Sequence, residues 1–292
     1  MGLMESKVSS QERETRNKFN TLKEYYDETW DLSDHTLHVG LFTKRTKSLE
    51  KAYRNATEFL ISKVNKLSKI DKNSIISDVG CGAGRTLIMI CERYGCSGVG
   101  VDISDEMIKD AKAHLQKTNQ RRKGRGQPKL NIKFIRGSGS DLSKFFKKDE
   151  QFTHIISQDA LFLVVDKRSL YSNLYRLLKK GGVLGIDDFL GERKKEELDT
   201  RQKELIYKMV NWAESLSFNS YRRILSSVGF KLISAEQKDK DMIKTYTILE
   251  NRMKKFSKSK DATYKNLQER YKSIAGAVKN KKMGWGIFTA IK

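Results

Sequence analysis

Three glycines at alternate positions, Gly80, Gly82 and Gly84, have the spacing in this chain that most directly suggests chemistry. They follow the short apolar run Ile75 to Val79, in which Asp78 stands two residues before the first glycine. Glycine lets a backbone turn sharply and come close to a ligand, where a Cβ atom would obstruct it. A strand, a glycine turn and a helix in this order form a nucleotide pocket at the carboxyl edge of a parallel sheet. A dinucleotide site would be spaced G-x-G-x-x-G, but here the third glycine comes one residue early.

The spacing Asp-x-Gly-x-Gly-x-Gly resembles motif I of the class I S-adenosylmethionine-dependent methyltransferases, whose ligand carries an amino acid and a sulfonium but no phosphate. Ser97 to Asp102 predicts a second buried strand that ends in a carboxylate about twenty residues past the glycines, where such folds bind ribose hydroxyls. Ile103 then packs on the adenine, and Ser104 begins the next helix. The alternative interpretation is a glycine turn in another kind of α/β protein.

A third strand is predicted at Asn131 to Ile135, and the loop Gly137-Ser138-Gly139 follows it. Methyltransferases of this class commonly carry an Asp at the Ser138 position, which accepts a hydrogen bond from the adenine amino group. Here a hydroxyl or a neighbouring backbone group must take that role. The resemblance therefore predicts a cofactor site made of Asp78, Gly80, Cys81, Gly82, Gly84, Asp102, Ile103, Met107, Ser138, Gly139 and Gln158.

A fourth strand, Phe152 to Ser157, delivers Gln158 and Asp159 to the same edge of the sheet. Reacting groups of open α/β sheets lie at the carboxyl ends of central strands. A carboxylate buried there is costly unless it is paired or useful. We therefore predict a catalytic or acceptor-binding role for Asp159, and the alternative is a structural cap of the following helix.

An aromatic stripe near the start of the chain predicts an amphipathic helix that ends near Asp34. Its members are Phe19, Leu22, Tyr25, Tyr26 and Trp30. Residues 1 to about 20 are polar, and we expect them to be frayed. The stripe and the following segment, 35–42, resemble the N-terminal lid of small-molecule methyltransferases. The alternative is a core stripe, favoured for Leu22 and Tyr25, while His38 fits a site role and a structural hydrogen bond equally.

The remaining segments alternate between helix and strand. We expect helices over 49–67, from 104 to about 115, over 170–178, 192–213 and 219–228, and through the Lys-rich region 241–282; a basic loop over 120–128; and strands over 183–186, 230–233 and 284–291. This order predicts an α/β fold with a Rossmann-like seven-stranded class I methyltransferase sheet. We expect an N-terminal helical lid over 1–70, an S-adenosylmethionine-binding core over 71–190, and a helical cap with the last strands over 191–292.

The formal net charge of +22 invites a nucleic-acid interpretation, because clustered Lys and Arg release counterions from phosphates. The basic residues are instead spread over helical stretches with acidic partners, so we consider a nucleic-acid partner unlikely. Cys81, Cys91 and Cys96 lack disulfide or metal spacing and predict a reduced, cytoplasmic protein without a metal site. No apolar run approaches a membrane span, and no signal peptide is visible. Gly2 fits a short myristoylation pattern, although Met4 is an equally good first residue.

Over nearly its whole length the chain is similar to the sarcosine and dimethylglycine N-methyltransferases and to the phosphoethanolamine N-methyltransferases. The similarity is carried by His38-Val39-Gly40-Leu41-Phe42, the glycine loop, Ser157-Gln158-Asp159-Ala160, Ser220-Tyr221-Arg222, Lys244-Thr245-Tyr246 and Gly284-Trp285-Gly286. The family often has a His four residues after the Asp, where this chain has Leu163. Because that His belongs to a catalytic dyad in the phosphoethanolamine enzymes, their mechanism does not transfer unchanged.

The resemblance implies a small-amine N-methyltransferase that converts S-adenosylmethionine to S-adenosylhomocysteine. In this interpretation Asp159 orients the amine, and His38 or Tyr26 relays its proton. The expected acceptor-binding residues are Trp30, Phe162, Tyr221, Tyr246 and Trp285. A methyltransferase acting on a lipid, sterol or secondary metabolite is the main alternative, and an RNA methyltransferase or a non-enzymatic protein is less favoured. The acceptor, the number of methyl groups added and the oligomeric state stay open.

Overall fold

The computed structural model describes residues 2–30, 36–191, 198–212 and 215–292. Its centre is one seven-stranded sheet with the order β3-β2-β1-β4-β5-β7-β6. The strands are β1 Ile75–Val79, β2 Ser97–Asp102, β3 Ile132–Arg136, β4 Phe152–Gln158, β5 Leu178–Gly191, β6 Lys231–Gln237 and β7 Met283–Ile291. The first five are parallel, and β7 lies antiparallel between β5 and β6. The predicted seven-stranded Rossmann-like sheet is confirmed.

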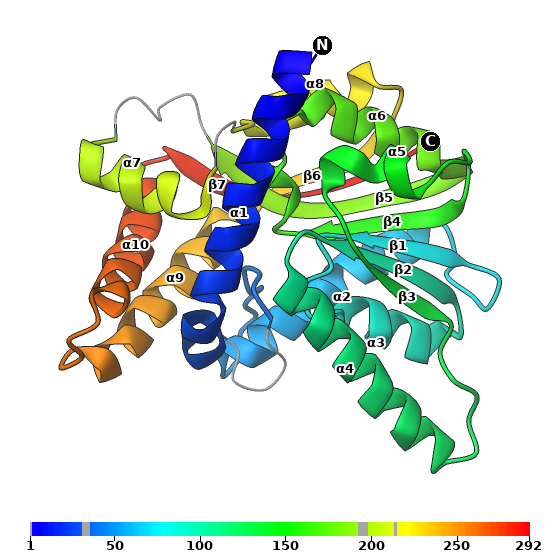
Figure 1. Cartoon of the computed structure of the whole chain (residues 1–292), viewed down its shortest axis with the longest axis horizontal. Helices are drawn as coiled ribbons and strands as arrows, with labels where there is room; N and C mark the ends of the chain where they lie inside the picture. Colours follow the sequence, from blue (N-terminus) through cyan, green and yellow to red (C-terminus); the bar gives the residue numbers. More distant parts are fainter. Residues whose placement is uncertain (1, 31–35, 192–197, 213–214) are drawn as a thin grey trace.

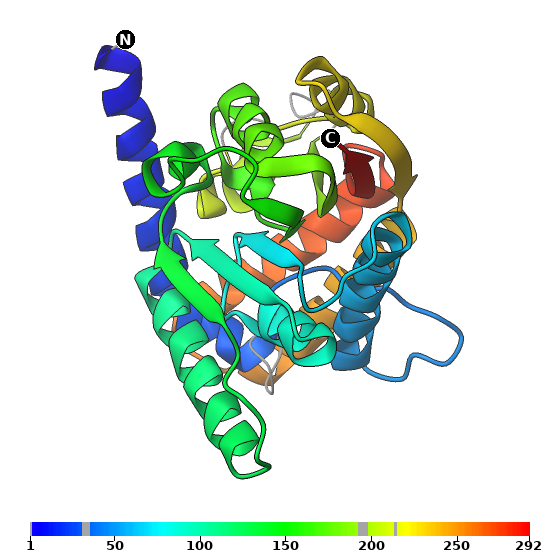
Figure 2. The ribbon, with the colours of Figure 1, turned by 90° about the vertical axis from the view of Figure 1, so that its right-hand side faces the viewer.

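Helices cover both faces of the sheet (Figures 1 and 2). The helices are α1 Gly2–Thr29, α2 Leu49–Leu67, α3 Arg85–Tyr94, α4 Asp105–Lys123, α5 Leu142–Phe145, α6 Lys167–Leu177, α7 Thr200–Ile206, α8 Phe218–Ser227, α9 Asp239–Met253 and α10 Ala262–Lys279. One apolar core joins α2, α3 and α4 to the sheet, and a second joins α5, α6 and α8 to it. Neighbouring residues of β4 show how a buried strand serves both cores, because Ile155 packs in one and Ile156 in the other.

A third core lies beyond the carboxyl edge of the sheet, where α7, α9 and α10 gather at one end of the molecule (Figure 1). Aromatic side chains fill it, and Trp30 stacks on Tyr53 with ring centroids 6.1 Å apart. The chain segment between β6 and β7 supplies α9 and α10, as a helical cap requires. The boundaries at residues 70 and 190 between lid, core and cap stay a prediction.

The start of the chain differs from the prediction. Residues 1 to about 20 were expected to be frayed, but a single helix, α1, runs from Gly2 to Thr29. Polar contacts hold it: the Ser104 hydroxyl donates to Asn20 Oδ1 at 2.6 Å, and Lys23 Nζ lies 2.8 Å from an Asp110 oxygen. Apolar periodicity does not record such contacts. The expected end of the helix near Asp34 lies outside the described residues.

Four further boundaries differ. The strand predicted over 183–186 is longer, since β5 begins at Leu178, directly after α6 ends at Leu177. Between 192 and 213 the described helix is α7, followed by a 3-10 turn at 208–210, while residues 192–197 and 213 lie outside the described residues. The Lys-rich region divides into α9 and α10. Helix α4 continues eight residues past the expected end at 115 and into the loop expected over 120–128; these residues are polar and largely exposed, so apolar periodicity does not mark them as helix.

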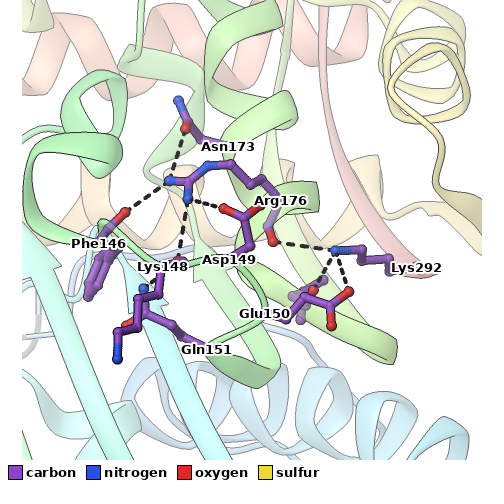
Figure 3. Close-up of polar contacts among 9 residues, drawn as sticks. Phe146, Lys148, Asp149, Glu150, Gln151, Asn173, Arg176 and Lys292 are labelled. Atoms are coloured by element: carbon purple, nitrogen blue, oxygen red, sulfur yellow. Dashed lines mark hydrogen bonds and ion pairs between the residues drawn. The ribbon is translucent and has the colours of Figure 1, made fainter.

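The amino edge of the sheet is closed by a polar cluster (Figure 3). Arg176, in the last turn of α6, donates to the Phe146 carbonyl at 3.1 Å and to Asp149 at 2.7 Å. Lys292 Nζ donates to the Leu178 carbonyl at 2.7 Å. These side chains satisfy carbonyl groups where the loop before β4 meets the start of β5, on the far side of the sheet from the glycine loop.

Candidate active site

A cavity opens at the carboxyl edge of β1, β2, β3 and β4, where the predicted site residues converge. From the predicted cofactor set it is lined by Asp78, Gly80, Cys81, Gly82, Asp102, Ile103, Met107, Ser138, Gly139 and Gln158. His38 and Asp159 also line it. Gly84 stands behind the loop, where an added Cβ atom would lie 2.5 Å from Phe134.

The glycine loop needs its glycines for two reasons. Gly80, Gly82 and Gly84 all have positive φ angles, of 78°, 49° and 75°. At Gly80 an added Cβ atom would also lie 2.1 Å from the Ala160 Cβ atom. At Gly82 no atom lies within 4 Å of that position, because it faces the cavity. The loop therefore keeps the backbone open toward a ligand.

Asp102 fixes this loop from the neighbouring strand. One carboxylate oxygen accepts from the Gly82 N–H at 2.8 Å, and the other accepts from the Ser104 N–H at 2.9 Å. Burial raises the pKa of Asp102, while these backbone donors and that of Ile103 oppose the rise. The carboxylate is thus held in place at the position from which ribose hydroxyls would be bound.

Asp78 is buried on the same wall of the cavity. Burial, followed by the negative charge of Asp102, raises its pKa from 3.8 to about 8. A cationic ligand group beside it would reverse this shift. Within the described part of the chain, no group of three or more His, Cys, Asp or Glu side chains is placed to hold a metal ion.

Asp159 connects three parts of the chain at the cavity wall. Its oxygens accept from the Val39 N–H of the lid segment at 2.6 Å and from Trp285 Nε1–H of β7 at 2.8 Å. Burial raises its pKa to about 8, the two donors lower it, and the charge of Asp188 raises it. Its φ angle of 47° is rare for a residue other than glycine.

His38 and Gln158 belong to one buried polar network. The Thr57 hydroxyl lies 3.1 Å from His38 Nε2 and 3.1 Å from Gln158 Oε1, and Gln158 Nε2 donates to Asp187 at 2.8 Å. His38 Nδ1 lies 3.0 Å from the Val39 carbonyl, which can only accept a hydrogen bond. This contact favours a proton on Nδ1, while the single proton of the Thr57 hydroxyl goes to Gln158 Oε1.

Six aromatic residues of the predicted site are not part of the cavity lining. They are Tyr26, predicted to relay a proton, and Trp30, Phe162, Tyr221, Tyr246 and Trp285, expected to bind the acceptor. Trp30 donates to the Tyr271 hydroxyl at 2.8 Å inside the cap core, and Phe162 stacks on Phe189 at 4.6 Å. Tyr221 packs against the opposite face of the sheet and donates to Asp188. Their apolar surfaces are used in packing, which residue type alone did not distinguish from ligand contact.

The lid helix contributes cavity residues that the sequence reasoning missed. Glu12, Thr15 and Phe19 of α1 line the cavity, together with Arg85 and Thr86 at the start of α3. Ser138 donates to Glu12 Oε1 at 2.5 Å. The expectation that residues before 20 are frayed hid the three lid residues; the N-terminal turn of α3 directly after the glycines was a signal for the other two.

The profile of the methyltransferase domain family matches residues 70–269, which is most of the chain and contains the glycine loop and Asp159. The chain belongs to the methyltransferase domain family. Its fold is that of the class I S-adenosylmethionine-dependent methyltransferases, as the glycine loop predicted. The chain therefore carries a methyltransferase domain, and S-adenosylmethionine is the cofactor that its family and fold imply.

Two curated relatives and one solved structure illustrate the likeness of this methyltransferase. It is 29% identical over 228 residues to phosphoethanolamine N-methyltransferase 1 of Zea mays, a match covering 74% of this chain and 41% of the relative. It is 27% identical over 197 residues to sterol 24-C-methyltransferase of Clavispora lusitaniae, covering 66% and 46%. A protein assigned as a sarcosine dimethylglycine methyltransferase from Galdieria sulphuraria superposes with a TM-score of 0.79 at 19% identity, covering 92% and 97%.

The chain spans less than half the length of these two curated relatives. No helix in the part of the methyltransferase that the structure describes is both long and apolar enough to cross a membrane.

Proposed function

We propose that this methyltransferase transfers a methyl group from S-adenosylmethionine to the nitrogen of a small amine. The observation that carries the proposal is a buried carboxylate, Asp159, on the wall of the cavity that also contains the glycine loop. An amine approaches as an ammonium ion and must lose a proton before its nitrogen can attack. A carboxylate in this position can both attract the cation and accept the proton.

The raised pKa of Asp159 makes that proton transfer easier. An aliphatic ammonium has a pKa of about 10, and Asp159 has one of about 8. The smaller the difference between the two pKa values, the less free energy the proton transfer costs. Burial of Asp159 thus lowers the cost of forming the neutral nucleophile.

The hydrogen bonds that fix the Asp159 carboxylate would also orient an amine bound to it. Val39 and Trp285 each occupy one lone pair, so each carboxylate oxygen keeps further capacity to accept. S-adenosylmethionine supplies an electrophilic methyl group, and displacement at that carbon requires the nitrogen to lie about 3 Å away and in line. His38, which lines the same cavity, is a second group suited to receive the proton.

A second candidate is a larger, apolar acceptor such as a lipid or sterol. The observation in its favour is the wall next to Asp159, where Leu161, Leu163 and Val164 line the cavity. Leu163 stands where related amine enzymes often have a His, so this wall offers apolar contact in place of an imidazole. The likeness to a sterol 24-C-methyltransferase agrees with this alternative.

Turnover of S-adenosylmethionine to S-adenosylhomocysteine should be measured with glycine, sarcosine, dimethylglycine, phosphoethanolamine and a sterol as acceptors. Turnover with an amine, together with its loss in Asp159→Ala at nearly unchanged S-adenosylhomocysteine affinity, is the expected result. Turnover with the sterol alone would support the second candidate. A parallel loss of turnover and cofactor affinity in Asp159→Ala would instead mean that the carboxylate only holds the lid segment and β7 in place.

A further inference from the structure

The lid helix places one carboxylate inside the cofactor cavity. Glu12 of α1 and Ser138 of the loop after β3 both line the cavity, and the Ser138 hydroxyl donates to Glu12 Oε1 at 2.5 Å. These residues are separated by 126 positions in the sequence. The contact therefore depends on α1 lying along the carboxyl edge of the sheet, between the cap helices and the strands (Figure 1).

The chemistry of this end of the cavity suits a flat base. Asp102 is positioned for ribose hydroxyls, and the apolar side chains of Ile103 and Met107, which follow it in the sequence, also line the cavity. Gly137 and Glu12 line the same cavity, and the hydrogen bond from Ser138 holds the Glu12 carboxylate beside the carboxyl end of β3. A base lying on the apolar side chains would direct its polar edge toward that end.

The exocyclic amino group of adenine is a donor and needs an acceptor at this edge. Ser138 is poorly placed to serve, because its single proton goes to Glu12 and its oxygen already accepts from the Ser140 N–H at 3.1 Å. A carboxylate has about four acceptor positions, and Ser138 uses one of those of Glu12. Glu12 is the side chain with spare acceptor capacity.

We propose that Glu12 accepts a hydrogen bond from the adenine amino group of the cofactor, so that a residue of the lid helix α1 recognises the base. Ser138 acts as a positioning residue that holds the Glu12 carboxylate in the cavity. Docking of α1 and binding of the cofactor are then linked. The same helix is held near the site by the bond between Ser104 and Asn20, and Asn211 donates to the Thr15 hydroxyl at 2.8 Å.

Calorimetric binding of two ligands tests this proposal without an acceptor or turnover. S-adenosylhomocysteine carries the amino group, and S-inosylhomocysteine carries an oxo group in its place, which would face the carboxylate as a second acceptor. We expect the wild-type protein to prefer the adenosyl ligand by about tenfold or more, as for a hydrogen bond to a charged group. In Glu12→Ala the ratio of the two affinities should approach one.

Two further variants keep the result decisive. Glu12→Gln keeps the size of the side chain but can donate an N–H to the oxo group, so its preference should move toward the inosyl ligand. Glu12→Ala combined with Ser138→Asp restores an acceptor and should restore the preference for adenosine. The matched control is Glu14→Ala on the same helix, since Glu14 pairs with Lys18 outside the cavity lining and should leave the ratio unchanged.

A wild-type protein that binds both ligands equally would overturn the proposal. So would a Glu12→Ala variant that keeps the wild-type ratio, even if both affinities fall, because loss of lid docking alone weakens both ligands together. Thermal unfolding of each variant without ligand separates a folding defect from loss of base recognition. Failure of this test would leave the acceptor proposal untouched, since neither ligand carries a transferable methyl group.

Discussion

Replacement of Asp78 by Asn should stabilise the ligand-free protein at neutral pH. Asp78 is 3% exposed, and its pKa rises from 3.8 to about 8 on folding because burial removes water and Asp102 adds a like charge. In the folded protein the group therefore stays protonated up to about pH 8, whereas in the unfolded chain it ionises above about pH 4. The contribution of Asp78 to the free energy of unfolding is therefore fully present below pH 4, and it is lost as the pH rises from 4 to 8.

The size of the effect follows from the same window. From the unfolded-state pKa of 3.8 up to pH 7, about three pH units, only the unfolded chain releases the Asp78 proton. At 1.36 kcal/mol per unit, the resulting loss in the free energy of unfolding has an upper limit of about 4 kcal/mol. An Asn of nearly the same shape carries no charge and avoids this loss. Urea unfolding of wild type and Asp78→Asn should therefore show a difference in the free energy of unfolding that grows between pH 4.5 and pH 7.5.

Asp102→Asn is the matched comparison, because Asp102 is half-buried at the end of the neighbouring strand but accepts from Gly82 and Ser104. An amide would turn an N–H₂ group toward one of these donors, so this variant should be less stable than wild type. With S-adenosylhomocysteine present, the advantage of Asp78→Asn should shrink, because the ammonium of the ligand favours the carboxylate. A gain that is equal at both pH values would refute the assignment of the shift to Asp78.

Three other changes have defined outcomes. Trp285→Phe removes a donor that lowers the pKa of Asp159, so the rise of turnover with pH should move to higher pH in a pH–rate profile. Gly80→Ala places a Cβ atom 2.1 Å from that of Ala160 at a φ of 78°, and should cost about 2–4 kcal/mol in urea unfolding while weakening S-adenosylhomocysteine binding. Arg176→Ala removes the amino-edge contacts and should cost about 1–3 kcal/mol, with cofactor affinity measured by calorimetry unchanged.

The central sheet and the glycine loop could be predicted because their signals are local. A buried parallel strand reads as an apolar run, and a glycine at a positive φ is required wherever the backbone turns onto a ligand. Asp78, Asp102 and Asp159 follow directly from this, since each stands at or just after the carboxyl end of a strand. The chain order of strands then brings the three carboxylates to one edge.

The lid could not be predicted in the same way. Its placement depends on pairs that are distant in sequence, such as Glu12 with Ser138 and Asn20 with Ser104, and neither partner of such a pair carries a pattern of its own. The aromatic residues show the converse problem. Trp285 is fully buried and uses its indole N–H to hold Asp159, a role that its residue type does not distinguish from stacking on a ligand.

The buried acids explain how a chain with a net charge of +22 can favour a cationic ligand. Asp78, Asp102 and Asp159 line one cavity, and burial raises the pKa of each because their charges have lost water. A positive charge entering the cavity lowers the free energy of all three carboxylates, whereas the surface charges act through solvent and are screened within about 10 Å. The sulfonium and ammonium groups of the cofactor and the ammonium of an amine acceptor would each be favoured by this arrangement. Electrostatic selection in the proposed site therefore depends on local burial and is largely independent of the net charge.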